Sequence, residues 1–273
     1  MIISVTSPRK RMGQTITAIN LSAMIAKTIR KNTILIDLNQ YCKDIEYYLS
    51  DTRITKGLDD FYSLYSSNLL DRRSFRTCVK KVRENIDIMA SNGCFEMDSQ
   101  GIRALLGYTE SLYPISVIDA ASRDNITPEV LFESSTVILV VINQMKNIVQ
   151  QINNSSYKRY KEKVFFVVNR YSEKIEGVRI KYRLQDIEHD LREAGYENSI
   201  FPLDYDPEIM NECNDQAVLN SILNKRGAGR NYVGQMECLA IHILKLGGLY
   251  TQEEVRSSAE KGVRKVFPLF NSF

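Results

Sequence analysis

The segment RKRMGQT (residues 9–15) joins an apolar run to a helical pattern. The run Met1–Val5 before it predicts a buried strand, and the stretch TITAINLSAMIAK (residues 15–27) after it predicts a helix. A strand, a short turn and a helix together are the setting in which a phosphate-binding loop forms. The segment therefore predicts the first unit of an α/β fold, with an anion site at its turn.

The turn carries only part of the chemistry that phosphate binding needs. Glycines with φ > 0 let backbone N–H groups converge on a phosphate, a lysine neutralises its charge, and a Ser or Thr holds magnesium. Gly13 and Thr15 are in place, but Gln14 stands at the lysine position. Lys10 and Arg11 stand where glycines are expected. The alternative is a solvated basic turn without a ligand.

Apolar runs that predict strands alternate with helical patterns along the chain. The predicted strands are Ile2–Val5, Thr33–Ile36, Ile86–Ala90, Ile115–Ile118, Val137–Ile142, Val164–Val168 and Ser199–Pro202. The predicted helices span 15–30, 58–66, 72–82, 98–112, 128–134, 146–161, 180–194 and 207–223. Several strand runs are continuously apolar, as expected where both faces are buried. The sequence predicts an α/β fold, a mostly parallel sheet with helices on both faces.

Polar residues follow three of the predicted strands at the end where ligands bind in such sheets. Asp37 ends the second strand, Asp119 the fourth and Asn169 the sixth. Asp and Asn also favour ordinary turns, which is the alternative explanation. Three such residues in register with a phosphate-loop-like turn favour a ligand site.

Composition limits the classes of function. With 44% hydrophobic and 25% charged residues, the 273-residue chain resembles an ordinary soluble globular protein. The net charge of +3 is too small to argue for nucleic acid. No apolar run reaches the roughly 18 residues that span a bilayer, and no signal peptide is apparent, so we expect a cytoplasmic protein.

Cysteine and histidine usage argues against zinc and redox cofactors. The cysteines at positions 42, 78, 94, 213 and 238 form no C-x-x-C pair, which favours a reducing compartment and core packing. His189 and His242 lack partners at ligand spacing.

We expect the chain to divide into three parts. Residues 1–224 form the α/β domain, residues 225–250 a linker and a final packing helix (Tyr232–Leu246), and residues 251–273 a tail. Apolar residues at helical spacing in the tail are flanked by Arg256, Lys261, Arg264 and Lys265. This pattern is typical of an interfacial membrane anchor, although Pro268 interrupts it. Packing on its own domain, packing on a dimer partner and disorder are the alternatives.

The stretch GQTITAINL (residues 13–21) resembles the GKTTTAINL of the ParA/MinD ATPases. Those proteins carry a deviant Walker A box, K-G-G-x-G-K-[ST], whose first lysine reaches across a homodimer. On this pattern Arg9 stands for the extra lysine and Gln14 for the Walker lysine. The resemblance implies a nucleotide-binding loop made of Arg9, Lys10, Arg11, Gly13, Gln14, Thr15 and Ile16.

Further matches imply a magnesium site and a water-positioning residue. Asp37 matches the first aspartate of a D-x-D motif and Asp119 the Walker B aspartate, which with Thr15 would hold Mg²⁺ directly or through water. Asn39 stands where the second aspartate would position the attacking water, and an amide is a poor base. Asp44 matches the last aspartate of the longer pattern found in the pilus-associated branch.

Two later segments resemble the parts of the family that bind the base. In FFVVNRY (residues 165–171), Asn169 matches an asparagine that reads adenine, and Arg170 follows it. In residues 201–214, the likeness to the region that closes over the base is carried by Pro202, Asp204, Asp206 and Asn214.

The resemblance covers roughly residues 1–224 and is closest to the TadZ/CpaE branch, to which GLDDF (residues 57–61) also points. It implies a homodimeric scaffold for spatial organisation or assembly, such as Flp/Tad pilus machinery, that binds protein partners and binds ATP or ADP with Mg²⁺ weakly or not at all. Because Gln14 lacks a charge and Asn39 lacks a carboxylate, we expect weak or absent ATP hydrolysis. The alternatives are an active ATP-dependent dimerisation switch that uses Arg9 or Lys10, and a DNA-partition protein.

Overall fold

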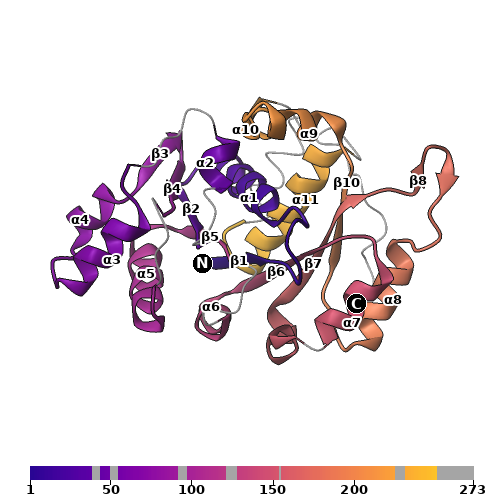
Figure 1. Cartoon of the computed structure of the whole chain (residues 1–273), viewed down its shortest axis with the longest axis horizontal. Helices are drawn as coiled ribbons and strands as arrows, with labels where there is room; N and C mark the ends of the chain where they lie inside the picture. Colours follow the sequence, from indigo (N-terminus) through magenta and orange to yellow (C-terminus); the bar gives the residue numbers. More distant parts are fainter. Residues whose placement is uncertain are drawn as a thin grey trace.

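The computed structural model describes residues 1–38, 44–49, 55–91, 97–120, 128–153, 155–224 and 231–250. Its centre is an eight-stranded sheet in the order β10-β7-β6-β1-β5-β2-β4-β3 (Figure 1). The strands are β1 (Ile2–Thr6), β2 (Thr33–Asp37), β3 (Lys80–Arg83), β4 (Ile86–Met89), β5 (Ile115–Asp119), β6 (Val137–Ile142), β7 (Val164–Tyr171) and β10 (Ile200–Asp204). All neighbouring pairs are parallel except β3 with β4.

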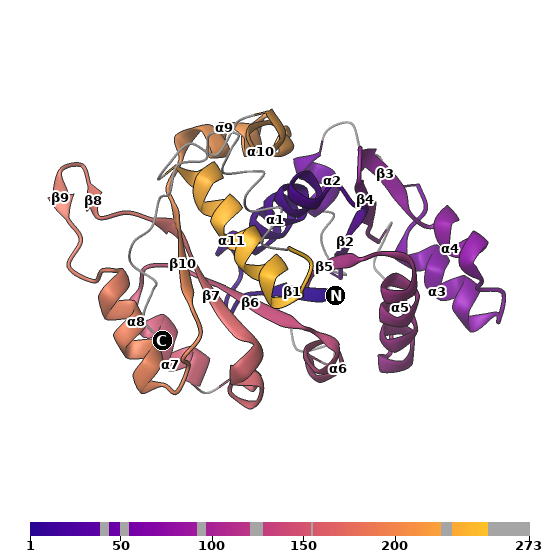
Figure 2. The same ribbon diagram turned by 180° about the vertical axis from the view of Figure 1, so that it is seen from behind.

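Helices cover both faces of this sheet, as the views from opposite sides show (Figures 1 and 2). On one face α1 (Gln14–Ile29) packs on β1, β2 and β5, and against α10 (Leu219–Asn224) and α11 (Tyr232–Leu246). The other face carries α5 (Ser99–Leu112), α6 (Pro128–Ser134), α7 (Lys146–Asn153), the 3₁₀ helix η1 (Ser156–Lys163) and α8 (Leu184–Glu193). The predicted α/β fold class is confirmed.

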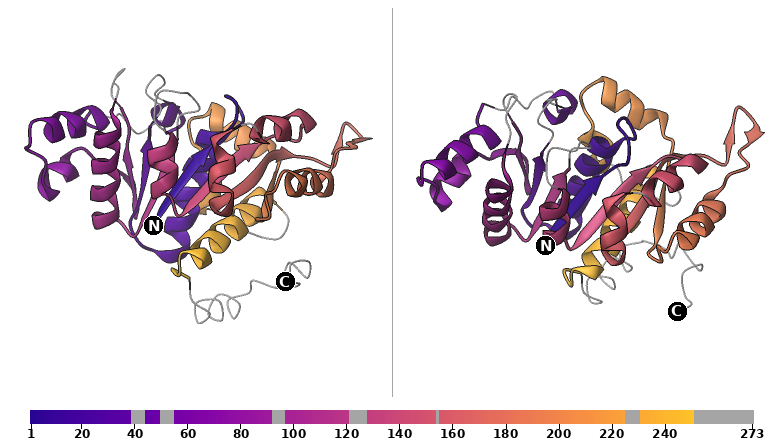
Figure 3. Two further views of the ribbon diagram at one scale, coloured as in Figure 1. Left: turned by 90° about the horizontal axis from the view of Figure 1, so that it is seen from below. Right: turned by 60° about the horizontal axis from the view of Figure 1, so that its bottom comes forward.

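Six further elements complete the described part of the chain. They are α2 (Asp44–Tyr48), α3 (Leu58–Ser66), α4 (Arg72–Thr77), α9 (Pro207–Asn214) and a small hairpin of β8 (Lys174–Ile175) and β9 (Val178–Arg179). This hairpin projects from the body of the molecule, as Figure 3 shows. Gln144 holds its base, because its side chain accepts from the Ser172 N–H (3.2 Å) and donates to the Tyr182 carbonyl (2.7 Å).

The central strands form where the sequence is continuously apolar. Every residue of β1, β2, β5 and β6 is buried, so that these strands have no solvent-facing side. The burial of this apolar surface is the main stabilising contribution to the domain.

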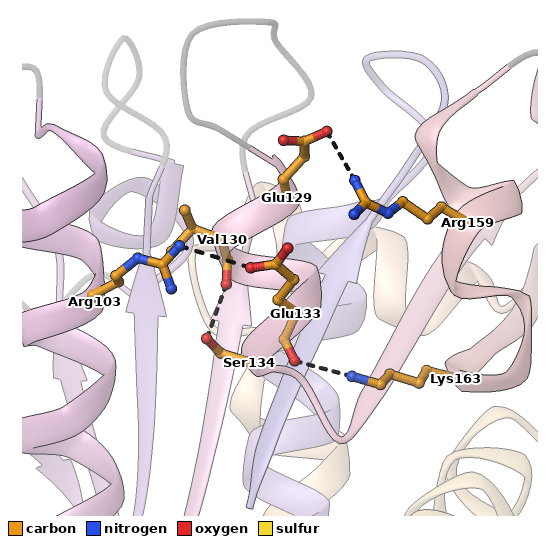
Figure 4. Close-up of polar contacts among 7 residues, drawn as sticks. All are labelled: Arg103, Glu129, Val130, Glu133, Ser134, Arg159 and Lys163. Atoms are coloured by element: carbon orange, nitrogen blue, oxygen red, sulfur yellow. Dashed lines mark hydrogen bonds and ion pairs between the residues drawn. The ribbon is translucent and has the colours of Figure 1, made fainter.

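Surface contacts hold α6 in its place over β1. Glu133 of α6 pairs with Arg103 of α5 (3.7 Å) and its carbonyl accepts from Lys163 Nζ (3.0 Å). Glu129 of α6 pairs with Arg159 of η1 (3.5 Å), so that charged residues join α6 to both neighbouring helices (Figure 4). Because the side chains of both ion pairs are exposed, each pair stabilises the fold by only about 0–1 kcal/mol.

Five predicted elements differ in detail. The predicted helix 72–82 ends at Thr77 and is followed by β3, because the charged strand Lys80–Arg83 alternates between half-buried and exposed positions. The predicted helices 146–161 and 207–223 are each divided in two, and 180–194 begins at Leu184. Asn169 lies within β7 rather than after it, since the strand continues to Tyr171.

The C-terminal part of the described chain is α11, whose first turn is capped by Asn231 through the Gly234 N–H. Its apolar residues are buried against α1 and β10. No helix in the described part of the chain combines the length and the apolar character needed to cross a bilayer. Residue Asn39, the linker 225–230 and the tail 251–273 lie outside the described residues.

Candidate functional site

The loop between β1 and α1 begins at the carboxyl edge of the sheet and ends on a glycine. Gly13 has φ 87° and precedes the first helical residue, Gln14. A Cβ atom at Gly13 would overlap the side-chain amide of Asn169, so that both backbone conformation and space require glycine here.

Arg11 also adopts φ > 0, at 63°. For a residue with a Cβ this conformation costs about 1–2 kcal/mol. Lys10 is not among the residues with positive φ. The loop thus has two residues with φ > 0, as an anion-binding turn requires. One is Gly13, which adopts this conformation readily, and the other is Arg11, which does not.

Gln14 joins the loop to the end of β5. Its Nε2 atom donates to Asp119 Oδ1 (2.5 Å) and to the Ala120 carbonyl. Its Oε1 atom lies 2.9 Å from the Ser7 hydroxyl, which can donate either to it or to the Arg9 carbonyl (2.6 Å). The side chain at the lysine position is therefore neutral and already engaged with protein groups on both sides.

The two predicted magnesium carboxylates are neighbours. Asp37 and Asp119 end adjacent parallel strands, stand opposite each other in the register and are each 1% exposed. Thr15 lies half-buried in the first turn of α1. Carboxylate and hydroxyl oxygens are hard ligands of the kind that Mg²⁺ takes. The structure thus brings Asp37 and Asp119 together beside the loop that Thr15 follows.

Asn169 reaches the loop from β7, two strands away from β1 in the sheet. Its Nδ2 atom donates to the Met12 carbonyl (2.8 Å), and its side chain lies against Gly13. The residue that the resemblance assigns to adenine is thus also a support of the phosphate-loop backbone. Arg170 beside it is exposed, with φ 54° and Nη2 3.7 Å from Met210 Sδ.

The basic residues of the loop point to solvent. Arg9, Lys10 and Arg11 are all exposed. Arg9 Nε donates to Gln151 Oε1 of α7 (2.6 Å), so that its guanidinium is turned toward the neighbouring helix. Arg9 is therefore exposed, with its side chain held against α7 by this hydrogen bond.

The other predicted base-binding residues belong to β10 and α9. Pro202 and Asp204 are half-buried in β10, where burial raises the pKa of Asp204 above its ordinary value. The Asp206 carboxylate caps α9 by accepting from the Glu208 N–H (2.9 Å), and Asn214 is exposed at the end of that helix. In the described chain we find no hydrogen bond between these four residues and the loop.

Asp44 begins α2, and Ile16 is half-buried in the first turn of α1. Sequence reasoning missed Ser7, the Ala120 carbonyl and Gln151. Ser7 was detectable as a hydroxyl at the start of the loop. Gln151 was not, because 142 positions separate it from its partner Arg9.

The donor set fits magnesium better than it fits a transferable phosphate. Two adjacent carboxylates suit a divalent cation, whereas the γ-phosphate needs a fixed cation at the position where Gln14 places an amide. Gln14 would have to leave Asp119 and Ala120 to meet a phosphate. In this structure the amide of Gln14 therefore occupies the place that the resemblance assigns to a lysine.

Neither models of protein families nor curated proteins match this chain. Several solved structures share its fold. A ParA family ATPase from Chlorobium tepidum has a TM-score of 0.72 at 14% identity, covering 89% of this chain and 98% of that one. MinD from Pyrococcus horikoshii in complex with Mg-ADP has a TM-score of 0.68 at 15% identity, covering 91% of this chain and 97% of that one. The MinC:MinD complex of Aquifex aeolicus has a TM-score of 0.70 at 14% identity, covering 89% of this chain and 95% of that one. The predicted ParA/MinD-like fold is confirmed.

Proposed function

We propose that this chain is a scaffold for spatial organisation or assembly that binds adenine nucleotide weakly and hydrolyses ATP slowly or not at all. The observation that carries the proposal is the engagement of Gln14 with Asp119 and the Ala120 carbonyl. Phosphoryl transfer depends on positioning and on neutralising charge, and a neutral amide supplies only a dipole at this point.

The hydrogen bonds of Gln14 also oppose nucleotide binding. A hydrogen bond to a charged group contributes about 1.5–3 kcal/mol, and a ligand that displaces Gln14 from Asp119 must replace it. Arg11 adds to the weakness because it occupies a position with φ > 0 that glycine fills more readily. Asn39, where the resemblance expects a carboxylate, would slow hydrolysis rather than weaken binding, because an amide is a poor base.

A scaffold of this fold would act through protein contacts. The fold is shared with a MinD that was solved in complex with MinC. By analogy, we infer a homodimer with Arg9 at the dimer interface, together with protein partners of a secretion, pilus or positioning system. The pilus-type assignment rests on the resemblance of Asp44 and of residues 57–61 to the TadZ/CpaE branch.

Phosphate release from Mg-ATP tests this proposal. We expect no turnover above the blank for the folded wild-type chain, and the same for Arg9→Ala and for the control Lys158→Ala, an exposed lysine of η1. Wild-type turnover that Arg9→Ala abolishes and Lys158→Ala leaves unchanged would overturn it, and would favour the active dimerisation switch. Circular dichroism on each variant confirms that the chain is folded.

A further inference from the structure

A short segment at one end of the sheet carries a large net positive charge. The segment Asp71–Arg83, which forms α4 and β3, holds six cationic residues and one carboxylate. Its net charge is +5, so that the other 260 residues together carry −2 of the chain's +3. Figure 1 shows α4 and β3 at the same end of the molecule's long axis, away from the loop between β1 and α1.

One side of helix α4 is packed against the core, and its arginines are exposed on the other side. Phe75 is fully buried, with its ring 5.9 Å from Phe61 and 5.7 Å from Tyr108. The helix begins with a capping box in which Asp71 accepts from the Ser74 N–H (2.6 Å). With this face fixed, three arginines of the helix are left exposed: Arg72, Arg73 and Arg76.

Strand β3 adds further cations to the same end. Lys81 and Arg83 are exposed and alternate with the half-buried Lys80 and Val82. Lysine on an edge strand commonly prevents pairing with another sheet. That role does not explain the arginines of α4, which is no part of the sheet edge.

Asp87 of β4, which lies beside β3, accepts a hydrogen bond from outside both α4 and β3. The Tyr113 hydroxyl donates to Asp87 Oδ2 (2.8 Å), and Asp87 stands opposite Lys81 in the sheet. Asp71 and Asp87 are each engaged by a hydrogen bond of their own.

An exposed leucine lies directly before the arginines. Leu69 is 67% exposed, although its backbone is fixed on both sides. Its N–H donates to the Leu64 carbonyl (2.9 Å), and its own carbonyl accepts from Ser74 Oγ of α4 (3.2 Å). The turn thus presents an apolar side chain beside the first turn of the basic helix.

We propose that this basic end, made of Leu69, Arg72, Arg73, Arg76, Lys81 and Arg83, binds the surface of an anionic lipid bilayer. Cations near such a surface are attracted to its headgroups, and an apolar side chain can enter the boundary of the acyl region. Leu69 has no comparable use on a nucleic-acid backbone. The segment 69–83 also has no exposed aromatic ring on which bases could stack. The proposal is independent of the nucleotide site.

Vesicle sedimentation of the full chain tests it. The vesicles are equimolar phosphatidylcholine and phosphatidylglycerol, or phosphatidylcholine alone. We expect binding to the first only, and a loss of about fivefold in the partition coefficient for each cation removed, or roughly a hundredfold for Arg72→Gln/Arg73→Gln/Arg76→Gln. The matched control is Lys158→Gln/Lys161→Gln/Lys181→Gln, which removes three exposed charges elsewhere and should retain binding.

Leu69→Ser separates the apolar contribution from the electrostatic one. We expect it to weaken binding severalfold at both low and about 0.15 M ionic strength, whereas the arginine variant loses mainly the salt-sensitive part. Absence of wild-type binding, equal losses in the control variant, or unchanged binding of the arginine variant would overturn the proposal. So would tighter binding of the wild type to a short duplex DNA than to the vesicles, lost in the same arginine variant.

Discussion

Gln14 is the residue on which the behaviour of the candidate site depends. Its amide bridges the Ser7 hydroxyl at one end of the loop and the Asp119 carboxylate at the end of β5. A lysine at this position would leave a positive charge for a phosphate, whereas the amide is satisfied by the protein itself. These contacts stabilise the folded chain, and under the proposed function they also oppose nucleotide binding.

Replacing Gln14 should accordingly destabilise the protein. We expect Gln14→Ala to lower the free energy of unfolding by about 1–3 kcal/mol, because it removes bonds to a buried carboxylate and a carbonyl. Urea unfolding followed by circular dichroism measures the difference. Gln151→Ala, which loses only the exposed bond to Arg9, should change stability by less than about 0.5 kcal/mol. Equal losses for the two variants would contradict the bridging role of Gln14.

Gly13 offers a second test at the same scale. Gly13→Ala meets both an unfavourable φ and the Asn169 amide, whereas Gly195→Ala meets the same φ of 87° with open space around it. We expect about 1–2 kcal/mol of destabilisation at Gly195 from the backbone alone. Gly13→Ala should cost about 1–3 kcal/mol more, from overpacking.

A double-mutant cycle checks the cause of that difference. In an Asn169→Ala background the extra cost of Gly13→Ala should fall, because the overlapping amide is gone. An extra cost that persists unchanged in this background would show that Asn169 is not the obstacle.

At the scale of elements, α11 introduces a pH-sensitive contact. His242 of this helix lies between Phe165 of β7 and Phe201 of β10, with ring centroids 5.7 and 5.0 Å away. Burial, and to a lesser degree the charge of Lys245, lower the pKa of His242 below its ordinary value. The unfolded chain therefore binds this proton more readily than the folded chain does.

The sign of the pH dependence follows from this difference. The contribution of His242 to stability is fully present above its unfolded pKa of about 6.5 and is lost as the pH falls below it. We expect the urea midpoint of the wild type to drop more between about pH 7.5 and pH 5.5 than that of His242→Gln, which is neutral at both values. Identical pH profiles would mean that this histidine titrates alike in the folded and unfolded chain.

The sequence predicted the buried strands correctly but not the exposed ones, and the difference has a physical cause. Strands such as β6 (Val137–Ile142) were predicted correctly because burial on both faces makes them continuously apolar. Strand β3 was predicted as helix because a short charged edge strand lacks that signal. The β8–β9 hairpin is almost entirely exposed, and its Ile175 and Val178 contribute nothing to the core pattern.

At the scale of the whole molecule, the strand order decides which residues meet. Strand β1 lies between β5 and β6, so that Gln14 contacts Asp119 across 105 positions of sequence. Because Asp37, Asp119 and Asn169 follow predicted parallel strands, the sequence predicted that they would lie at one edge of the sheet. The bond from Gln14 to Asp119 and the support of Met12 by Asn169 could not be predicted, because side-chain direction is set by packing.

Nucleotide-dependent thermal unfolding of the full chain tests most directly the claim that the loop grips phosphate poorly. The wild type and Gln14→Lys are compared with Mg-ATP, Mg-ADP and no nucleotide. A ligand at a hundredfold excess over its Kd stabilises a protein by about 2.7 kcal/mol. We predict that millimolar Mg-ATP gives the wild type a shift well below this value and gives Gln14→Lys a larger one. A wild-type shift of that full size, equal to or greater than the shift of Gln14→Lys, would contradict the account.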